Sequence, residues 1–286
     1  MATATSPLYS ETIMPRWTDI LKANSTLIMG VLNVTPDSFS DGGRFLGIDA
    51  AIEHATQMAR DGAGIIDVGG QSTRPGAKPL SVGEELGRVK PVVERLVRKI
   101  DVPISIDTFQ PEVADECLQA GAAIINDVCG LRDPRMIAVA ARHQAPVVLM
   151  HMLGTPMTMQ KEINYQDVVE DLKTFFGQRT RAAAAGGLRE IMIDPGIGFG
   201  KTADHNLQLL GRLAEFKELG YPVLVGASRK SFIGKITGLP VEERLEGTIA
   251  ATVAAALNGA DAVRVHDVAE CKRALLITDA IKRRRS

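Results

Sequence analysis

Eight short apolar segments recur along the chain, and a longer stretch with helical character follows each of them. Their residues are apolar almost throughout, which is typical of parallel strands that are covered on both faces. Because eight strand–helix units follow one another with no linker, the sequence predicts a single α/β domain folded as a (β/α)8 TIM barrel. The expected strands are residues 27–34, 65–69, 104–107, 124–127, 146–150, 191–194, 223–226 and 262–265.

A doubly wound open sheet is the competing architecture for alternating strands and helices. That fold usually carries a GxGxxG turn after its first strand, and no such turn occurs here. A length of 286 residues is ordinary for one barrel. We therefore expect a barrel over residues 26–286, preceded by a poorly structured lead-in of residues 1–25 that is placed to cover the barrel bottom.

Start and stop signals mark the helices of these units. A capping side chain followed three positions later by an acid predicts that helices begin after Ser81, Asp167 and Asp267. Glycine supplies the left-handed conformation that ends many helices. Such a glycine stands before five of the expected strands, at Gly62, Gly121, Gly187, Gly220 and Gly259.

The composition excludes several classes of function. A formal net charge of −1 argues against nucleic acid as the main partner. No apolar run approaches the roughly 18 residues that a membrane span needs, and the first residues have neither an apolar leader nor arginine enrichment. The cysteines Cys117, Cys129 and Cys271 lack metal or redox spacing. We interpret them as buried thiols of a cytoplasmic protein without a membrane partner.

Polar side chains collect where the expected strands end, which is the face that carries the chemistry in such barrels. Asp107, Asp194, Lys230 and Arg264 would converge there, although buried charges are costly unless they are paired. The spacing of two residues along a strand puts Arg264 and His266 on the same side. The other candidates near strand ends are Asn33, Asn126, Asp127, His151 and Ser231.

Most of these side chains also have a purely structural interpretation. Asp127 and Asp194 could cap a turn or a helix, and for Asp127 the cap is the favoured interpretation. His151 is interpreted as a wall histidine that is satisfied within the core. Arg264 and His266 could form a surface pair. The convergence of four charged groups on one mouth argues for a site instead.

The mixture of groups suggests what the site binds. Two carboxylates and an amide, from Asp107, Asp194 and Asn126, could bind a flat heterocycle with several N–H donors. Arginine suits bidentate contact with phosphate. Phosphate oxygens could therefore be held by Arg74, Arg264, His266 and Asn33. An amide beside a phosphate is also a suitable ligand for Mg²⁺, which often has few protein ligands.

Seven motifs between about residue 27 and residue 268 carry more specific information. The two longest are MGVLNVTPDSFSDGG at residues 29–43 and DVGGQSTRPGA at residues 67–77. The others are SIDT at 105–108, INDV at 125–128, DPGIGFGK at 194–201, GASRKSFIG at 226–234 and RVHDV at 264–268. Together they resemble dihydropteroate synthase. Gln71 departs from the family, which often has glutamate there, and the absence of a preceding pterin pyrophosphokinase domain leads us to expect a monofunctional form.

The resemblance implies a transferase of folate biosynthesis. It would join p-aminobenzoate to 6-hydroxymethyl-7,8-dihydropterin diphosphate and release diphosphate and 7,8-dihydropteroate. The implied pterin ligands are Asp107, Asn126, Asp194 and Lys230, and the implied Mg²⁺ ligand is Asn33. The implied diphosphate ligands are Arg74, Arg264 and His266, with Arg264 also stacking on the pterin. The p-aminobenzoate pocket would be formed by Phe39, Pro75, Phe199 and Ser231, with Thr73 and Asp41 at the reacting centre. Related enzymes are typically dimers, so a homodimer is expected.

An aniline nitrogen is a weak nucleophile, so catalysis has to assist the leaving group. Mg²⁺, arginine and histidine would neutralise the charge that develops on the departing diphosphate. Asp41 is a candidate for stabilising positive charge on the exocyclic methylene. With Lys230, Arg264 and His266 it makes up the expected catalytic set, and the mechanism requires no general base.

Two other functions compete with this transferase. A pterin-binding module for methyltetrahydrofolate-dependent corrinoid methyl transfer would share the pterin-binding carboxylates and amide. The two long loop motifs and Lys230 favour the transferase, because they serve diphosphate and p-aminobenzoate. A phosphate-binding barrel with an unrelated substrate is the third hypothesis.

Overall fold

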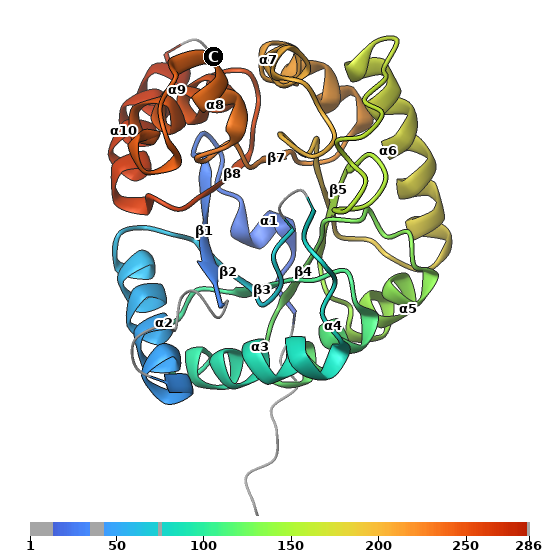
Figure 1. Ribbon diagram of the computed structural model, residues 1–286, viewed down its shortest axis with the longest axis vertical. Coiled ribbons are helices and arrows are strands. Elements are labelled where there is room, and N and C mark those ends of the chain that lie inside the picture. Colours follow the sequence, from blue (N-terminus) through green and yellow to red (C-terminus); the bar gives the residue numbers. More distant parts are fainter. Residues whose placement is uncertain (1–13, 35–42, 74–75, 285–286) are drawn as a thin grey trace, which may run out of the picture.

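Eight parallel strands form a ring at the centre of the molecule, and helices surround the ring (Figure 1). The structure is a computed structural model that describes residues 14–34, 43–73 and 76–284, with the backbone alone described for residues 43–46. Hydrogen-bonded neighbours follow the order β6-β5-β4-β3-β2-β1-β8-β7. A parallel bridge between Ile193 and Val223 joins the two ends of this order, so the sheet closes into the expected TIM barrel.

The strands lie where the sequence predicts them. Their bounds are β1 Leu27–Asn33, β2 Ile65–Gly69, β3 Ile104–Asp107, β4 Ile124–Asp127, β5 Val147–Met150, β6 Ile191–Asp194, β7 Leu224–Val225 and β8 Ala262–Val265. Only β1, β5 and β7 are shorter than expected, and Val223 contributes just the isolated bridge that precedes β7.

Helices follow the strands on the outside of the ring. The α-helices are α1 Trp17–Ile20, α2 Gly43–Arg60, α3 Val82–Leu96, α4 Pro111–Gln119, α5 Pro134–His143, α6 Val168–Ala185, α7 Ala203–Gly211, α8 Ser231–Thr237, α9 Leu245–Leu257 and α10 Val268–Lys282. The 3₁₀ helices are η2 Leu213–Leu219 and η3 Val241–Glu243. Within the described ranges, no helix has both the length and the apolar character needed to cross a membrane.

The three predicted helix starts are confirmed, since α3, α6 and α10 begin directly after Ser81, Asp167 and Asp267, and two of these side chains cap their helix. The Ser81 hydroxyl accepts the Glu84 N–H at 3.3 Å, and the Glu84 carboxylate accepts the Ser81 N–H at 3.0 Å. Asp167 accepts two backbone N–H groups of the first turn of α6. The cap predicted for the Asp267 side chain was wrong, because its carboxylate accepts the Arg229 Nε–H at 2.9 Å and no N–H of α10. The five predicted stop glycines all have φ between +78° and +108°.

The floor of the barrel interior is an apolar layer. It consists of Met29, Ile65, Ile124, Val148, Met192, Leu224 and Ala262, which the two-residue period of the strands turns inward. Trp17 of α1 packs against this layer and is only 3% exposed. Figure 1 shows α1 within the outline of the ring, where it closes the amino-terminal end of the barrel. The domain boundary near residue 26 stays a prediction.

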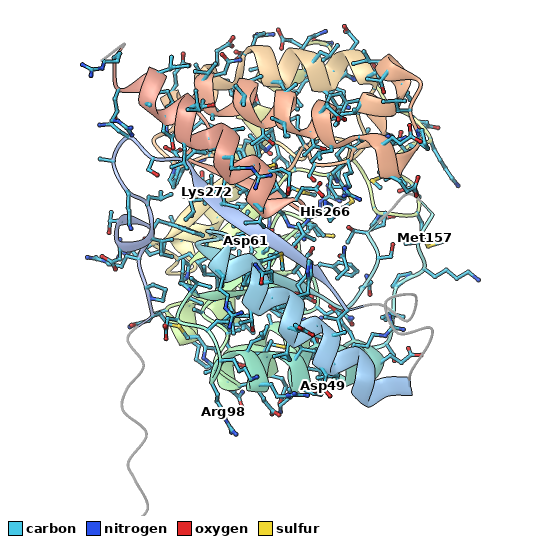
Figure 2. All side chains as sticks on the ribbon, turned by 90° about the vertical axis from the view of Figure 1, so that its left-hand side faces the viewer. Asp49, Asp61, Arg98, Met157, His266 and Lys272 are labelled. Atoms are coloured by element: carbon cyan, nitrogen blue, oxygen red, sulfur yellow. The ribbon has the colours of Figure 1, made fainter. Side chains whose placement is uncertain are left out.

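A polar layer lies directly above this floor. Two residues beyond the floor positions of β2, β4, β6 and β8 stand Asp67, Asn126, Asp194 and Arg264. The alternation that builds the apolar floor therefore also presents charged side chains at the carboxyl ends of the strands. In Figure 2, His266 lies away from the side of the molecule where α1 is found, in agreement with its position after β8.

Candidate active site

Asp67 is the centre of the polar layer. Its side chain is fully buried, and its Oδ2 accepts the Arg264 Nε–H at 2.6 Å and the Asn126 Nδ2–H at 2.9 Å. Arg264 also donates from Nη2 to Oδ2 of Asp107 at 2.8 Å. Side chains from β2, β3, β4 and β8 are thus joined in one network. Charge-assisted hydrogen bonds are short and strong, so the network fixes the guanidinium before a ligand arrives.

Two carboxylate oxygens of this network have no partner. Among the described residues, Oδ1 of Asp67 and Oδ1 of Asp107 are buried and receive no hydrogen bond. An unsatisfied buried acceptor is costly, and a ligand that carries N–H groups would remove the cost. Burial raises the pKa of Asp107 to about 7, and the attraction of Arg264 opposes this shift. The site therefore presents acceptors that favour a hydrogen-bond donor as ligand.

Asp194 ends β6 in the same layer and is 4% exposed. Its Oδ1 accepts the Gly196 N–H at 2.7 Å, so the turn-cap interpretation is confirmed. Burial raises the pKa of Asp194 to about 6, while the Gly196 N–H and the cations Lys230 and Arg264 lower it. The same carboxylate thus caps a turn and lies within the field of the cations Lys230, Arg264 and Lys201.

Lys230 is brought to the site by the turn after β7, at the residue that precedes α8. Its Nζ lies 4.0 Å from the centroid of the Phe199 ring, within the range of a cation–π contact. Phe199 is half-buried in the loop that follows β6, and Ser231 is the exposed first residue of α8. An ammonium and an aromatic face from two neighbouring loops therefore form one wall of the mouth.

His266 follows β8 and is held by Ser228. Its Nδ1 lies 2.9 Å from the Ser228 hydroxyl, which also accepts the His266 backbone N–H at 3.2 Å. This arrangement favours a hydroxyl that donates to Nδ1 and leaves the ring proton on Nε2. Burial and the nearby Arg264 lower the pKa of His266 to about 4, so the ring is neutral at neutral pH. The Arg264 side chain is 19% exposed and pairs with Asp67, so the surface-pair alternative is wrong.

Asn33 and Thr73 lie at the same end of the barrel. Asn33 is the exposed last residue of β1. Its register partner on β2 is Gly69, which has no side chain to fill the neighbouring space. Its amide oxygen is a hard ligand of the kind that Mg²⁺ accepts. Thr73 is half-buried in the segment after β2. The predicted residues Phe39, Asp41, Arg74 and Pro75 lie outside the described residues.

The structure supports the structural interpretation of two candidates. Asp127 accepts the backbone N–H groups of Cys129 and Leu131 at 2.7 and 2.9 Å, so it caps a turn. His151 is 6% exposed, and its Nδ1 lies 2.9 Å from Nζ of Lys201. Burial and the charge of Lys201 lower the pKa of His151 to about 2, which keeps the imidazole neutral. Neither side chain is part of the network around Asp67.

Sequence reasoning missed three residues of the site. Asp67 and Ser228 lie within quoted motifs but were given no role, and Lys201 ends the DPGIGFGK motif. The signal for Asp67 was available, because it stands two residues after Ile65 on β2 and so faces inward. The signal for the other two was absent, since their partners are histidines far away in the sequence.

Comparisons with known proteins agree with this geometry. A family model described as "Pterin binding enzyme" matches residues 29–266. Dihydropteroate synthase of Synechocystis sp. is 50% identical over 262 residues, which are 90% of this chain and 91% of that protein.

Solved structures give the same family. Dihydropteroate synthase of Xanthomonas albilineans with 4-aminobenzoic acid superposes with a TM-score of 0.85 at 46% identity, over 90% of this chain and 93% of that chain. The enzyme of that organism in complex with 7,8-dihydropteroate gives a TM-score of 0.82 at 43% identity, over 92% and 95%. With these matches across nearly the whole barrel, this chain belongs to the pterin-binding enzymes and, among them, to the dihydropteroate synthases.

Proposed function

We propose that the polar layer of the barrel binds the pterin substrate of the dihydropteroate synthase reaction, and that the loops at the mouth bind p-aminobenzoate. That reaction joins p-aminobenzoate to 6-hydroxymethyl-7,8-dihydropterin diphosphate in folate biosynthesis. The observation that carries the proposal is the Arg264-bridged pair Asp67 and Asp107, which leaves two buried carboxylate oxygens without donors. A pterin ring presents several N–H donors on one edge, which is the complement of such a layer.

The pterin ring would lie on the carboxylate side of the mouth. Asp107, Asn126 and Asp194 would accept or exchange hydrogen bonds with its ring nitrogens and exocyclic groups. Lys230 would donate to a ring acceptor, and its contact with Phe199 would keep the ammonium in place. The guanidinium of Arg264 would lie against the ring, because Asp67 and Asp107 already fix its plane.

The diphosphate would lie over the ends of β1 and β8. His266 would donate its Nε2–H to a phosphate oxygen as a neutral group, and Arg264 and Arg74 would supply charge. Mg²⁺ would be held by Asn33 together with phosphate oxygens and water, because no group of three or more His, Cys, Asp or Glu side chains that could hold a metal occurs in the described part of the chain. When bound, the ion would neutralise charge on the leaving group.

The p-aminobenzoate would lie beside Phe199 and Ser231, with Phe39, Pro75 and Thr73 completing its pocket. Its amino nitrogen attacks the exocyclic methylene carbon while the carbon–oxygen bond to diphosphate breaks and the electron pair leaves with the diphosphate. Asp41 would stabilise positive charge on the methylene, and the amine loses its proton afterwards. The described residues act by placing the two substrates in line and by stabilising departing charge.

The test of this proposal compares two buried strand-end aspartates. Asp194→Asn should abolish detectable dihydropterin binding by calorimetry, because the inward carboxylate is lost. Asp127→Asn is the matched control, since burial raises the pKa of both carboxyls to about 6 and both cap a turn, while Asp127 belongs to the outward side of β4. We expect the control to bind dihydropterin normally. Equal loss in both variants would refute the pterin site.

Activity is tested by mixing the protein with Mg²⁺, the pterin diphosphate and p-aminobenzoate, with detection of dihydropteroate by mass. Formation of dihydropteroate by the wild type, and its loss in Asp194→Asn, is the expected result. Pterin binding without any condensation would favour the corrinoid methyl-transfer alternative.

The proposed protein partner is a second copy of the chain. The apolar side chains Leu245, Ile249 and Val253 of α9 are one candidate for the contact, and they are half-buried within one chain. Apolar side chains on the adjacent α10 are more exposed, namely Leu276 at 58%, Ile277 at 65% and Ile281 at 46%. Light scattering should give twice the chain mass, and Ile277→Glu should reduce it toward one chain. A wild-type monomer at assay concentration would refute the dimer.

The proposed compartment is the cytoplasm. Cys117, Cys129 and Cys271 are free thiols, and burial raises their pKa values to about 12, 12 and 11. Protonated thiols that are not paired suit a reducing compartment. Cell fractionation with antibody detection should place the protein in the cytosolic fraction, and recovery with membranes would refute this.

A further inference from the structure

Several backbone groups of the loop between β6 and α7 are hydrogen-bonded to side chains. Asp194 accepts the Gly196 N–H, and Asn206 accepts the Gly198 N–H, each at 2.7 Å. The carbonyls of Gly198, Phe199 and Gly200 accept hydrogen bonds from Gln160, Lys201 and Tyr165 at 3.2, 3.0 and 3.0 Å. One of these five contacts comes from a buried lysine, which the proposed mechanism does not use.

Lys201 is 4% exposed and forms no salt bridge with any of the described residues. Its Nζ lies 3.0 Å from the Phe199 carbonyl oxygen, 2.9 Å from Nδ1 of His151 and 3.5 Å from the His151 carbonyl oxygen. An ammonium has three donors, and these three acceptors account for them. Burial lowers the pKa of Lys201 to about 7, with Asp194 opposing the shift. The amine is therefore held at a substantial desolvation cost.

His151 connects this amine to the barrel wall. It directly follows β5, its N–H donates to the Asp194 carbonyl at 2.9 Å, and its ring packs edge-on against Phe175 at 4.8 Å. Because the neutral ring uses Nδ1 as the acceptor, it presents a fixed partner to the ammonium. Lys201 thus links the Phe199 peptide to a rigid strand end.

The two halves of the loop are held by different contacts. The half near Asp194 is fixed by the Asp194 carboxylate, which accepts the Gly196 N–H, and by the His151 N–H, which donates to the Asp194 carbonyl. It also lies close to β5, because a Cβ at Gly196 would overlap with the His151 carbonyl oxygen. The half that carries Phe199 has its carbonyl fixed by Lys201. The Phe199 ring lies 4.0 Å beneath Nζ of Lys230. Loss of Lys201 should therefore displace Phe199 more than Asp194.

We propose that Lys201 is a positioning residue that holds the Phe199 ring beneath Lys230 by tying the Phe199 carbonyl to His151 at the end of β5. The inference rests on the proposed function, in which Phe199 is part of the p-aminobenzoate wall and Asp194 binds the pterin. It predicts that Lys201 acts on the second substrate and hardly on the first. Lys201 itself touches neither substrate.

Lys201→Met tests the proposal, because methionine fills a similar volume without a donor. We expect the KM for p-aminobenzoate to rise by about 10- to 100-fold, the effect of a misplacement of about 1 Å. The Kd for dihydropterin, measured by calorimetry, should change by less than about twofold. Asp279→Ala is the control for general destabilisation, since it removes a buried contact with Thr26 just before β1, and its KM should be unchanged. Equal weakening of both substrates in Lys201→Met would overturn the proposal.

A second pair of variants decides the matter if Lys201→Met folds poorly. In His151→Asn the amide oxygen can take the place of Nδ1 as an acceptor, whereas His151→Leu offers none. We expect the asparagine variant to restore most of the low KM for p-aminobenzoate that the leucine variant loses. Equal KM values in the two variants would overturn the role of the Lys201–His151 contact. A wild-type protein that makes no dihydropteroate would instead refute the proposed function.

Discussion

Nη2 of Arg264 lies 2.8 Å from Oδ2 of Asp107, so an ion pair spans the mouth of the barrel from β8 to β3. The strands β1 and β2 lie between β8 and β3 in the sheet. Asp67 of β2 accepts a hydrogen bond from the Nε–H of the same guanidinium. Two of the donor groups of Arg264 are therefore already used by carboxylates. Arg264 is therefore the counter-ion of two buried carboxylates as well as a proposed diphosphate ligand. Removing one member of a buried ion pair leaves an uncompensated charge, so the loss of Arg264 should affect the carboxylates as well as the diphosphate.

This relationship separates the expected effects of Arg264→Ala and His266→Ala. Arg264→Ala should weaken both the pterin diphosphate and the free pterin alcohol, because Asp67 and Asp107 lose their counter-ion. His266→Ala should weaken the diphosphate by about tenfold or more, the loss of one hydrogen bond to a charged group, and leave the alcohol nearly unchanged. Calorimetric titration of each variant with both ligands measures this. If His266→Ala weakened both ligands equally, His266 would not be a diphosphate ligand.

The raised pKa of Asp107 predicts how pterin binding depends on pH. With a pKa of about 7, Asp107 is increasingly protonated below neutral pH in the free protein, and a donor-rich pterin binds the ionised form. Binding therefore lowers this pKa, and affinity should fall by up to about tenfold per pH unit as the pH falls below about 7. Titration in two buffers with different ionisation enthalpies should show proton release on binding near neutral pH.

Asp127→Asn is the control for this pH dependence. Burial raises the pKa of Asp127 to about 6, but its oxygens are used by the N–H groups of Cys129 and Leu131. The variant should keep the same slope of pterin affinity against pH as the wild type. A flat affinity between about pH 8 and pH 6 in the wild type would show that Asp107 does not change its protonation on binding.

The fold was largely predictable, because eight apolar segments and five helix-ending glycines are local signals. The site was predictable in part. Strand ends identified Asp107 and Asp194, but the network around Asp67 depends on a guanidinium that is 197 positions away. Asp267 shows the same limit at a helix start, since the pattern for a cap is local while its actual partner Arg229 is supplied by another loop. Charged side chains bind the strongest partner that the fold brings near, and sequence alone does not reveal which one that is.

Gly196 offers a test of how closely the loop after β6 lies on β5. Its φ is +67°, and a Cβ there would overlap with the His151 carbonyl oxygen. Gly196→Ala should therefore cost more than the roughly 1–2 kcal/mol of a left-handed backbone alone, and dihydropterin affinity should fall as Asp194 moves. Gly177→Ala in α6 is the matched control, with open space at its Cβ, and should raise stability by about 0.5–1 kcal/mol. Equal stability of the two variants in urea would contradict the close contact.

The buried pair of Thr26 and Asp279 should contribute to stability without affecting the site. Oδ2 of Asp279 on α10 accepts the Thr26 N–H at 2.9 Å, and Oδ1 accepts the Thr26 hydroxyl at 2.8 Å. Asp279→Ala removes both acceptor oxygens, so the buried Thr26 N–H and hydroxyl lose their hydrogen-bond partners. We expect a loss of about 1–3 kcal/mol in the free energy of unfolding. The sole tryptophan, Trp17, packs under the barrel floor and reports unfolding by its fluorescence. Because Thr26 precedes β1 at the end of the barrel opposite the mouth, dihydropterin affinity of the folded variant should match the wild type. A variant with unchanged stability would show that this contact does not stabilise the fold. A variant with impaired pterin binding would show that its effect is not confined to the packing of α10 against the start of β1.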